Sequence, residues 1–379
     1  MTQHVDKQFV SSVSPGAARA GAGGYPVQGV YYTPAGTRPR VAMISTHYQI
    51  DFSEHYLADL MAERGIGFLG WNTRYRGYEW QFQLDQALVD IGVGVRWLKE
   101  EAGVDRVILL GNSGGGSLMA AYHSQAVEPC VRPARDMAPA PGADDLIPGD
   151  GYVSLAAHLG RPDVLTDWLD ASVTDEHDIT STDPELDLFN PENGPPYSPE
   201  FVARYRAAQV ERNHRITRWA RAELDRITPL GYGDQTFSVL RTWADPRMVD
   251  PTIEPSERPA GQCYRGPTEV ANKGGHGIGG QTTLRNWLNM WSLEESQCRA
   301  EPHLAKVTVP ALVINPDGDT GVFPSDAERI YDAIDSTDKT RMDLPGDHYF
   351  QQPVGARDKV ADEIAAWVGS RFPEAGEQA

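Results

Sequence analysis

The chain has 379 residues, a length that suits either two domains or one large α/β domain that carries an insertion. Its 34 basic and 53 acidic residues give a formal net charge of -19, which argues against nucleic acid or an anionic membrane as a partner. The three cysteines, Cys130, Cys263 and Cys298, lack C-x-x-C spacing, so neither a zinc site nor a redox pair is expected. The sequence leaves a bridge between Cys263 and Cys298 open.

The chain shows no signal for export or membrane insertion. Residues 1–6 have neither the basic nor the apolar segment of a secretory signal, and no apolar run approaches the roughly 18 residues of a membrane span. Together with the cysteine pattern, these features predict a reducing, cytoplasmic setting.

Short apolar runs alternate with helical periodicity along much of the chain, and this alternation predicts a mostly parallel sheet flanked by helices. Apolar residues at spacings of three and four, from Leu84 to Leu98, predict one long amphipathic helix. The expected strands are 8–13 and 25–33, which form an opening hairpin, then 41–45, 66–71, 107–110, 152–156, 311–315 and 341–344. The other expected helices are 53–64, 117–121, 325–334 and 359–368.

This alternation is lost between about residues 160 and 305, which predicts an inserted, mainly helical cap. The expected divisions are residues 1–160 and 306–379 for the core and 161–305 for the cap, with cap helices at 199–227 and 282–293. The first of these helices carries seven arginines against four acids. They indicate either a solvated, salt-bridged face or recognition of an anionic substrate group.

The most informative stretch of the chain is a serine between glycines. Gly111, Ser113 and Gly115 form a G-x-S-x-G pattern between the strand 107–110 and the small-residue helix 117–121. In such a nucleophile elbow, a strand turns sharply into a helix and exposes the serine hydroxyl above the sheet. Glycines are needed on either side because a Cβ there would collide with the facing strand or helix.

An elbow serine becomes a nucleophile when a histidine removes its proton and a carboxylate orients that histidine. Both groups follow downstream. The strand 311–315 ends in an acidic loop with Asp317 and Asp319, and the strand 341–344 ends in a loop with His348.

The order of nucleophile, acid and base resembles that of the α/β-hydrolase superfamily, over about residues 40–160 and 305–370. The resemblance implies an α/β-hydrolase fold, with a mostly parallel central sheet and an inserted cap. It also implies that Ser113 is the nucleophile, His348 the base and Asp319 the acid. Asp317 is the competing acid, but the spacing of Asp319 to Val322 matches the G-x-x-D-x-x-V type of loop more closely.

The resemblance further implies an oxyanion hole with two N–H donors. One donor is the backbone of Gly114, and the second is expected in the loop after the strand 41–45. This chain has no HGGG-type run there, so Tyr48 is the expected donor and His47 the alternative. His47, Asp51 and His55 could also suggest a metal site, but no H-E-x-x-H pattern supports it, so no metal or other cofactor is expected.

These features predict a serine hydrolase that cleaves a small-molecule carboxylic ester through an acyl-enzyme. Thioester, amide or C–C hydrolysis and acyl transfer are alternatives on the same fold, and a non-catalytic ligand-binding protein is an alternative of another class. No nucleic acid or membrane partner is expected. The sequence does not determine the oligomeric state, and a homodimer is one option.

Overall fold

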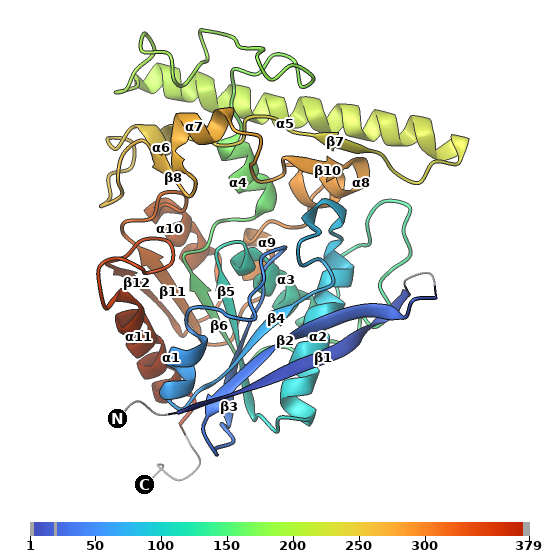
Figure 1. The fold of residues 1–379 in the computed structure, drawn as a ribbon, viewed down its shortest axis with the longest axis vertical. Helices are drawn as coiled ribbons and strands as arrows, with labels where there is room; N and C mark the ends of the chain where they lie inside the picture. The colour runs from blue at the N-terminus through green and yellow to red at the C-terminus, as the bar shows by residue number, and fades with distance from the viewer. Residues whose placement is uncertain (1–3, 19–20, 374–379) are drawn as a thin grey trace.

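The computed structural model describes residues 4–18 and 21–373, and an eight-stranded sheet runs through its centre (Figure 1). The strand order is β1-β2-β4-β3-β5-β6-β11-β12. β1 and β2 are antiparallel to their neighbours, and all other pairs in the sheet are parallel, which confirms the predicted mostly parallel sheet. The strands are β1 (Val5–Ala18), β2 (Gly24–Pro34), β3 (Val41–Ser45), β4 (Gly67–Asn72), β5 (Arg106–Asn112), β6 (Gly151–Leu155), β11 (Ala311–Pro316) and β12 (Lys339–Leu344).

The opening hairpin is longer than predicted. β1 pairs with β2 from Val5, opposite Pro34, to Val13, opposite Pro26, and the register then shifts before Ala18. Residues 19 and 20 of the predicted connecting turn lie outside the described residues.

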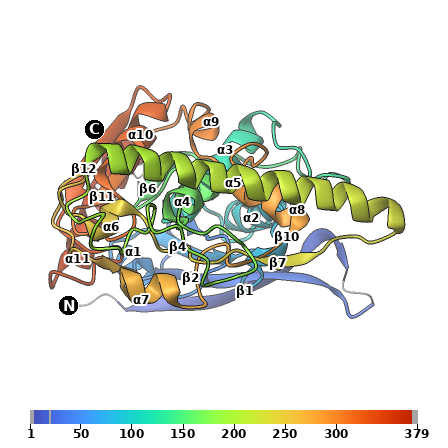
Figure 2. The ribbon, with the colours of Figure 1, turned by 90° about the horizontal axis from the view of Figure 1, so that it is seen from above.

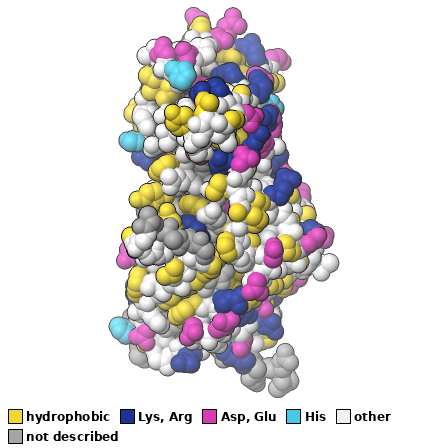
Figure 3. Space-filling model, turned by 90° about the vertical axis from the view of Figure 1, so that its right-hand side faces the viewer, with side chains coloured by type: hydrophobic (Ala, Val, Ile, Leu, Met, Phe, Trp, Pro, Cys, Tyr) yellow, Lys and Arg dark blue, Asp and Glu magenta, His cyan; other side chains and the backbone are white. Residues whose placement is uncertain are grey.

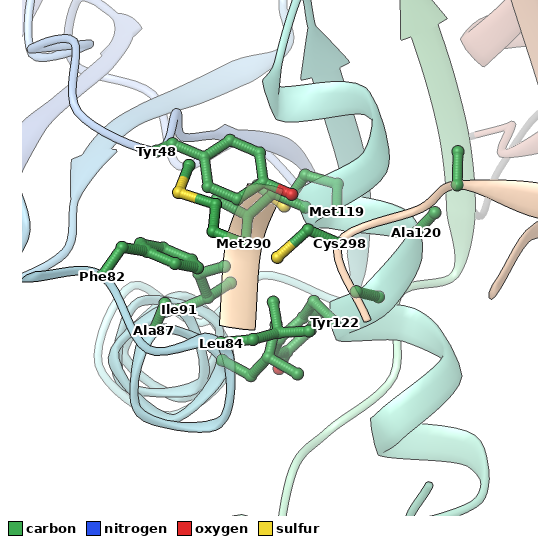
Figure 4. Close-up of a cluster of buried hydrophobic side chains, with 14 of the residues drawn as sticks. Tyr48, Phe82, Leu84, Ala87, Ile91, Met119, Ala120, Tyr122, Met290 and Cys298 are labelled. Atoms are coloured by element: carbon green, nitrogen blue, oxygen red, sulfur yellow. The ribbon is translucent and has the colours of Figure 1, made fainter. Parts of the chain in front are cut away.

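Helices cover both faces of the sheet, as the alternation of strand side chains requires. Met43 and Ile108 point to one face, where they pack with α1 (Ala58–Glu63) and α11 (Ala356–Arg371). Ile44 and Leu109 point to the other face, against the helices α2 (Leu84–Glu100), α3 (Gly115–Val127) and α10 (Pro324–Ala333). Figure 4 shows part of this second core, in which Leu84 and Ile91 of α2 lie near Met119 and Tyr122 of α3.

Residues 156–310 lie between β6 and β11 and are here called the insert. Its long helix α5 runs across the top of the molecule, above the carboxyl ends of the parallel strands (Figures 1 and 2). The elements of the insert are α4 (Arg161–Trp168), α5 (Pro199–Ile227), η2 (Thr228–Leu230), β7 (Thr236–Ser238), α6 (Pro246–Val249), β8 (Gln262–Cys263), β9 (Gly266–Pro267), α7 (Thr268–Lys273), β10 (Gln281–Thr283), α8 (Leu284–Asn286), η3 (Trp287–Trp291) and α9 (Glu301–Leu304).

Two predicted helices differ in the structure. The helix expected at 53–64 begins only at Ala58, because the preceding residues form turns in which the His55 N–H donates to the Phe52 carbonyl at 3.1 Å. The helix expected at 282–293 is divided into β10, one turn of α8 and the π-helical η3. There Thr282 pairs with Phe237 of β7, and the Thr283 hydroxyl caps α8 by accepting the Asn286 N–H at 3.1 Å.

The helix expected at 199–227 is α5, and its arginines have partners within the protein. Arg212 and Arg215 both pair with Glu176, at 2.6 and 3.0 Å, and Arg221 pairs with Glu295 at 2.6 Å. This pattern is the salt-bridged face that the sequence analysis considered, and it leaves these arginines engaged within the insert.

Figure 3 shows one side of the molecule, on which acidic and basic side chains are interspersed. Among the described residues, no helix is both long enough and apolar enough to cross a membrane.

We expect Gly115→Ala to lower the free energy of unfolding by about 1–3 kcal/mol, the usual range for overpacking. A Cβ at Gly115 would lie 2.4 Å from the Thr46 carbonyl oxygen, a backbone atom that cannot move aside. Chemical denaturation measures the change. The matched control is Gly369→Ala in α11, where a Cβ meets nothing within 4 Å, and it should leave stability unchanged or raise it. Equal losses in both variants would contradict this packing argument.

We expect the protein to lose stability as the pH falls from about 6.5 to about 4, partly because of His123. This side chain is buried in α3 without a hydrogen-bond partner among the described residues, and burial lowers its pKa to about 4. The unfolded chain therefore binds more protons in this range, which favours unfolding by as much as about 3 kcal/mol. Denaturation across this range should show a shallower pH dependence for His123→Leu. The exposed His177→Leu variant should keep the wild-type slope, and the same slope in all three proteins would contradict the assignment.

Candidate active site

Ser113 occupies the sharp turn between β5 and α3, with a φ of 55° in the left-handed region. Its N–H donates to the Leu155 carbonyl of β6 at 3.0 Å, which fixes the turn to the neighbouring strand. A Cβ at Gly111 would lie 2.5 Å from the Gly116 Cα. A Cβ at Gly115 would lie 2.4 Å from the carbonyl oxygen of Thr46, in the loop that follows β3. The structure therefore gives the physical reason for the glycine spacing of the motif.

His348 and Asp319, predicted as base and acid, lie in direct contact. His348 Nδ1 is 2.5 Å from Asp319 Oδ2, and both side chains are buried. Asp319 Oδ1 also accepts the backbone N–H groups of Gly321 and Val322, at 2.9 and 3.1 Å. The competing Asp317 instead accepts the Gly346 N–H at 3.2 Å.

The other ring nitrogen of His348 is left unengaged. Nε2 is buried and forms no hydrogen bond with any residue that the structure describes. An imidazole held at Nδ1 with a free Nε2 has the arrangement that a general base needs.

A tyrosine that the sequence analysis did not single out joins this pair. The Tyr264 hydroxyl lies 2.8 Å from Asp319 Oδ1 and 2.9 Å from His348 Nδ1, and its ring centroid is 4.4 Å from that of His348. Tyr264 lies in the insert, between β8 and β9, so the insert contacts the acid and base directly. No local motif marks this tyrosine, because its role depends on how the insert folds back over the loop at Gly321.

The predicted oxyanion residues lie together beside the elbow. A Cβ at Gly114 would lie 2.8 Å from His47 Nε2 and 3.3 Å from Tyr48 Cδ2. The N–H groups of Gln49 and Ile50 both approach His47 Nδ1 at 3.3 Å, which leaves Nε2 as the protonated nitrogen facing Gly114. The Tyr48 hydroxyl points away from this space, to the Ser117 hydroxyl at 3.0 Å.

Arg161 is a second residue that the sequence analysis missed. It is the first residue of α4, it is buried, and its Cζ lies 3.3 Å from the position of a Cβ on Gly114. Its guanidinium pairs with Glu79 of η1 (Glu79–Gln81), at 2.5 Å between Nη2 and Oε1. Burial, Arg161 and neighbouring histidines hold the pKa of His47 well below its usual value, and burial with Arg161 does the same for His158.

Two of the residues considered for a metal site have other partners in the structure. His55 Nε2 is 3.1 Å from Asn112 Oδ1, and Asp51 pairs with Arg76 at 2.8 Å. Within residues 4–18 and 21–373, no group of three or more His, Cys, Asp or Glu side chains could hold a metal ion.

Comparison with known proteins rests on solved structures, since no protein-family model and no curated protein matches the chain. The chain is similar to the α/β hydrolase GrgF from Penicillium sp. sh18, with a TM-score of 0.52, 12% identity and coverage of 97% of this chain and 99% of GrgF. It is also similar to DcsB in complex with its substrate analogue, with a TM-score of 0.50, 14% identity and coverage of 97% and 100%.

These likenesses extend over nearly the whole length of the chain, and the identities are low, so they bear on the fold alone. The chain therefore has the fold of the α/β-hydrolase superfamily.

Proposed function

We propose that the protein is a serine hydrolase that cleaves a carboxylic ester through Ser113, His348 and Asp319. The observation that carries this proposal is the His348–Asp319 contact of 2.5 Å, with Nε2 of the same imidazole buried and unengaged by any described residue. The strained turn at Ser113 supports it. A backbone φ of 55° costs a serine conformational energy, and such strain persists mainly at functional sites, where the surrounding structure holds it. The likeness of the fold to GrgF, described as an α/β hydrolase, is consistent with this chemistry.

In the proposed reaction, His348 Nε2 removes the proton from the Ser113 hydroxyl, and the oxygen attacks the ester carbonyl. The Gly114 N–H, at the N-terminus of α3, is suited to hold the oxyanion, with Tyr48 N–H or His47 Nε2–H as the second donor. Protonated His348 then gives its proton to the leaving alcohol. Water activated by the same imidazole hydrolyses the acyl-enzyme and frees the serine.

The proposal also covers the setting of the protein. A small-molecule ester-like substrate suits the covered site, and a reducing, cytoplasmic setting is supported by the free thiols of all three cysteines.

Fluorophosphonate labelling tests the nucleophile and the base together. We expect the wild-type protein to form an adduct on Ser113, located by peptide mapping, and we expect Ser113→Ala and His348→Ala to lose it. Esterase activity should fall by at least about a thousandfold in both variants, because triad residues act as a unit. Circular dichroism controls for folding. A folded wild-type protein that forms no adduct, or forms one elsewhere, would overturn the triad and favour a ligand-binding protein.

We expect the Tyr264 hydroxyl to fix the relative positions of the Asp319 and His348 side chains. Tyr264→Phe keeps the ring against His348 and removes only the hydroxyl bonded to Asp319. We expect kcat and the rate of fluorophosphonate labelling to fall by about tenfold, the size of one hydrogen bond to a charged group, while KM changes little. Tyr197→Phe removes a buried hydroxyl bonded to the Leu188 carbonyl, away from the site, and serves as the matched control. Equal kinetics for Tyr264→Phe and wild type would show that the hydroxyl is dispensable.

A further inference from the structure

We propose that Arg161 binds an anionic group of the substrate, a carboxylate, next to the carbonyl that Ser113 attacks. This inference rests on the proposed function, and it names the class of ester that the site takes: the ester of an acid that carries a second, free carboxylate.

The first support is the position of Arg161. The Arg161 N–H donates to the Cys298 carbonyl at 3.2 Å, and the adjacent Gly160 bridges to Arg299, so the start of α4 is tied to the far end of the insert. The guanidinium then lies against Gly114, the residue after Ser113. A group bound by Arg161 would therefore lie beside Gly114, the residue that follows Ser113 in the chain.

The second support is the unused bonding capacity of the guanidinium. Its ion pair with Glu79 is its one salt bridge among the described residues. Its Nε is buried and has no hydrogen-bond partner among the described residues. Buried donors without acceptors are costly, so a group that supplies acceptor oxygens here recovers free energy.

The third support is that the guanidinium is held in place. Its Cζ lies 4.5 Å from the centroid of the Tyr48 ring and 5.4 Å from that of Trp291. Tyr48 is itself fixed by its bond to Ser117 and by the ring of Phe82, at 4.8 Å between centroids. Figure 4 shows Tyr48 beside Phe82, Met290 and Cys298 in the buried hydrophobic cluster. Arginine presents a planar array of donors that matches a carboxylate, so a fixed guanidinium favours that ligand over a neutral one.

The experiment compares matched aryl esters. One series consists of 4-nitrophenyl monoesters of dicarboxylic acids with four to six carbons, whose second carboxylate is free. The other series has the same acids with that carboxylate capped as a methyl ester. The measured quantity is the ratio of kcat/KM for the free acid to kcat/KM for the capped ester, after subtraction of the uncatalysed rates.

We expect the wild type to prefer at least one free acid over its capped partner by about tenfold or more, the size of a charge-assisted hydrogen bond. Because Arg161→Met alone would leave Glu79 as an unpaired buried charge, the main variant is the double substitution Arg161→Met with Glu79→Gln. It should lose this preference, because kcat/KM for the free acid should fall by at least about tenfold more than kcat/KM for the capped ester. The control is Arg218→Met with Glu211→Gln, an exposed pair that should leave the preference intact.

Two outcomes would overturn the inference. One is a wild type that labels at Ser113 but shows no preference for any free acid, including a wild type that hydrolyses neither series. The other is a double variant that loses activity on both series equally while it stays folded, since Arg161 would then act on the reacting carbonyl instead of a second carboxylate. Absence of labelling at Ser113 in the wild type is a separate result, because it removes the proposed function itself.

Discussion

The sharp turn from β5 into α3 is the constraint on which the rest of the site depends. It holds Ser113 at a positive φ, and this is possible only because glycines before and after it allow the Gly116 backbone and the Thr46 carbonyl to approach closely. The same turn places the N-terminus of α3 beside the serine, where its free N–H groups favour negative charge. The position of the nucleophile and the position of the helix N-terminus that stabilises an anion are therefore both set by this one turn.

The parallel sheet brings the other groups to this turn. β5, β6, β11 and β12 are neighbours, and the loops after β11 and β12 carry Asp319 and His348. Because the carboxyl ends of parallel strands lie at the same edge, residues far apart in sequence meet above it. The contact between acid and base is thus a consequence of strand order.

Much of this arrangement could be predicted from the sequence, because it depends on local patterns. The glycines around Ser113 and the apolar strands before Asp319 and His348 are each recognisable within a few residues. Tyr264 and Arg161 could not be predicted in this way, since each acts on a partner far away in the chain. The helix expected at 282–293 is shorter in the structure, where α8 and η3 cover residues 284–291, because Thr282 and Thr283 pair with β7 instead of starting the helix.

The insert is held by buried charges as well as by apolar contacts. Asp245 pairs with Arg206 at 2.6 Å and with Arg247 at 2.8 Å, and although burial raises its pKa, these arginines lower it to about 2. Asp170 pairs with Arg241 at 2.6 Å and accepts the Asn272 amide at the same distance. Breaking such pairs is costly, so they define one arrangement of the insert.

That arrangement has an evolutionary consequence, because the insert supplies both the hydroxyl on Asp319 and the guanidinium beside Gly114. In a protein whose cap only covers the cleft, loops of the cap can diverge freely while the reaction centre stays intact. Here a substitution that moves the insert displaces groups at the acid and at the elbow together. Substrate range and turnover are therefore expected to change together among descendants of this chain. If the insert were exchanged between homologues, the residues that it contacts in the core, Glu79 and Gly321, would have to be exchanged with it.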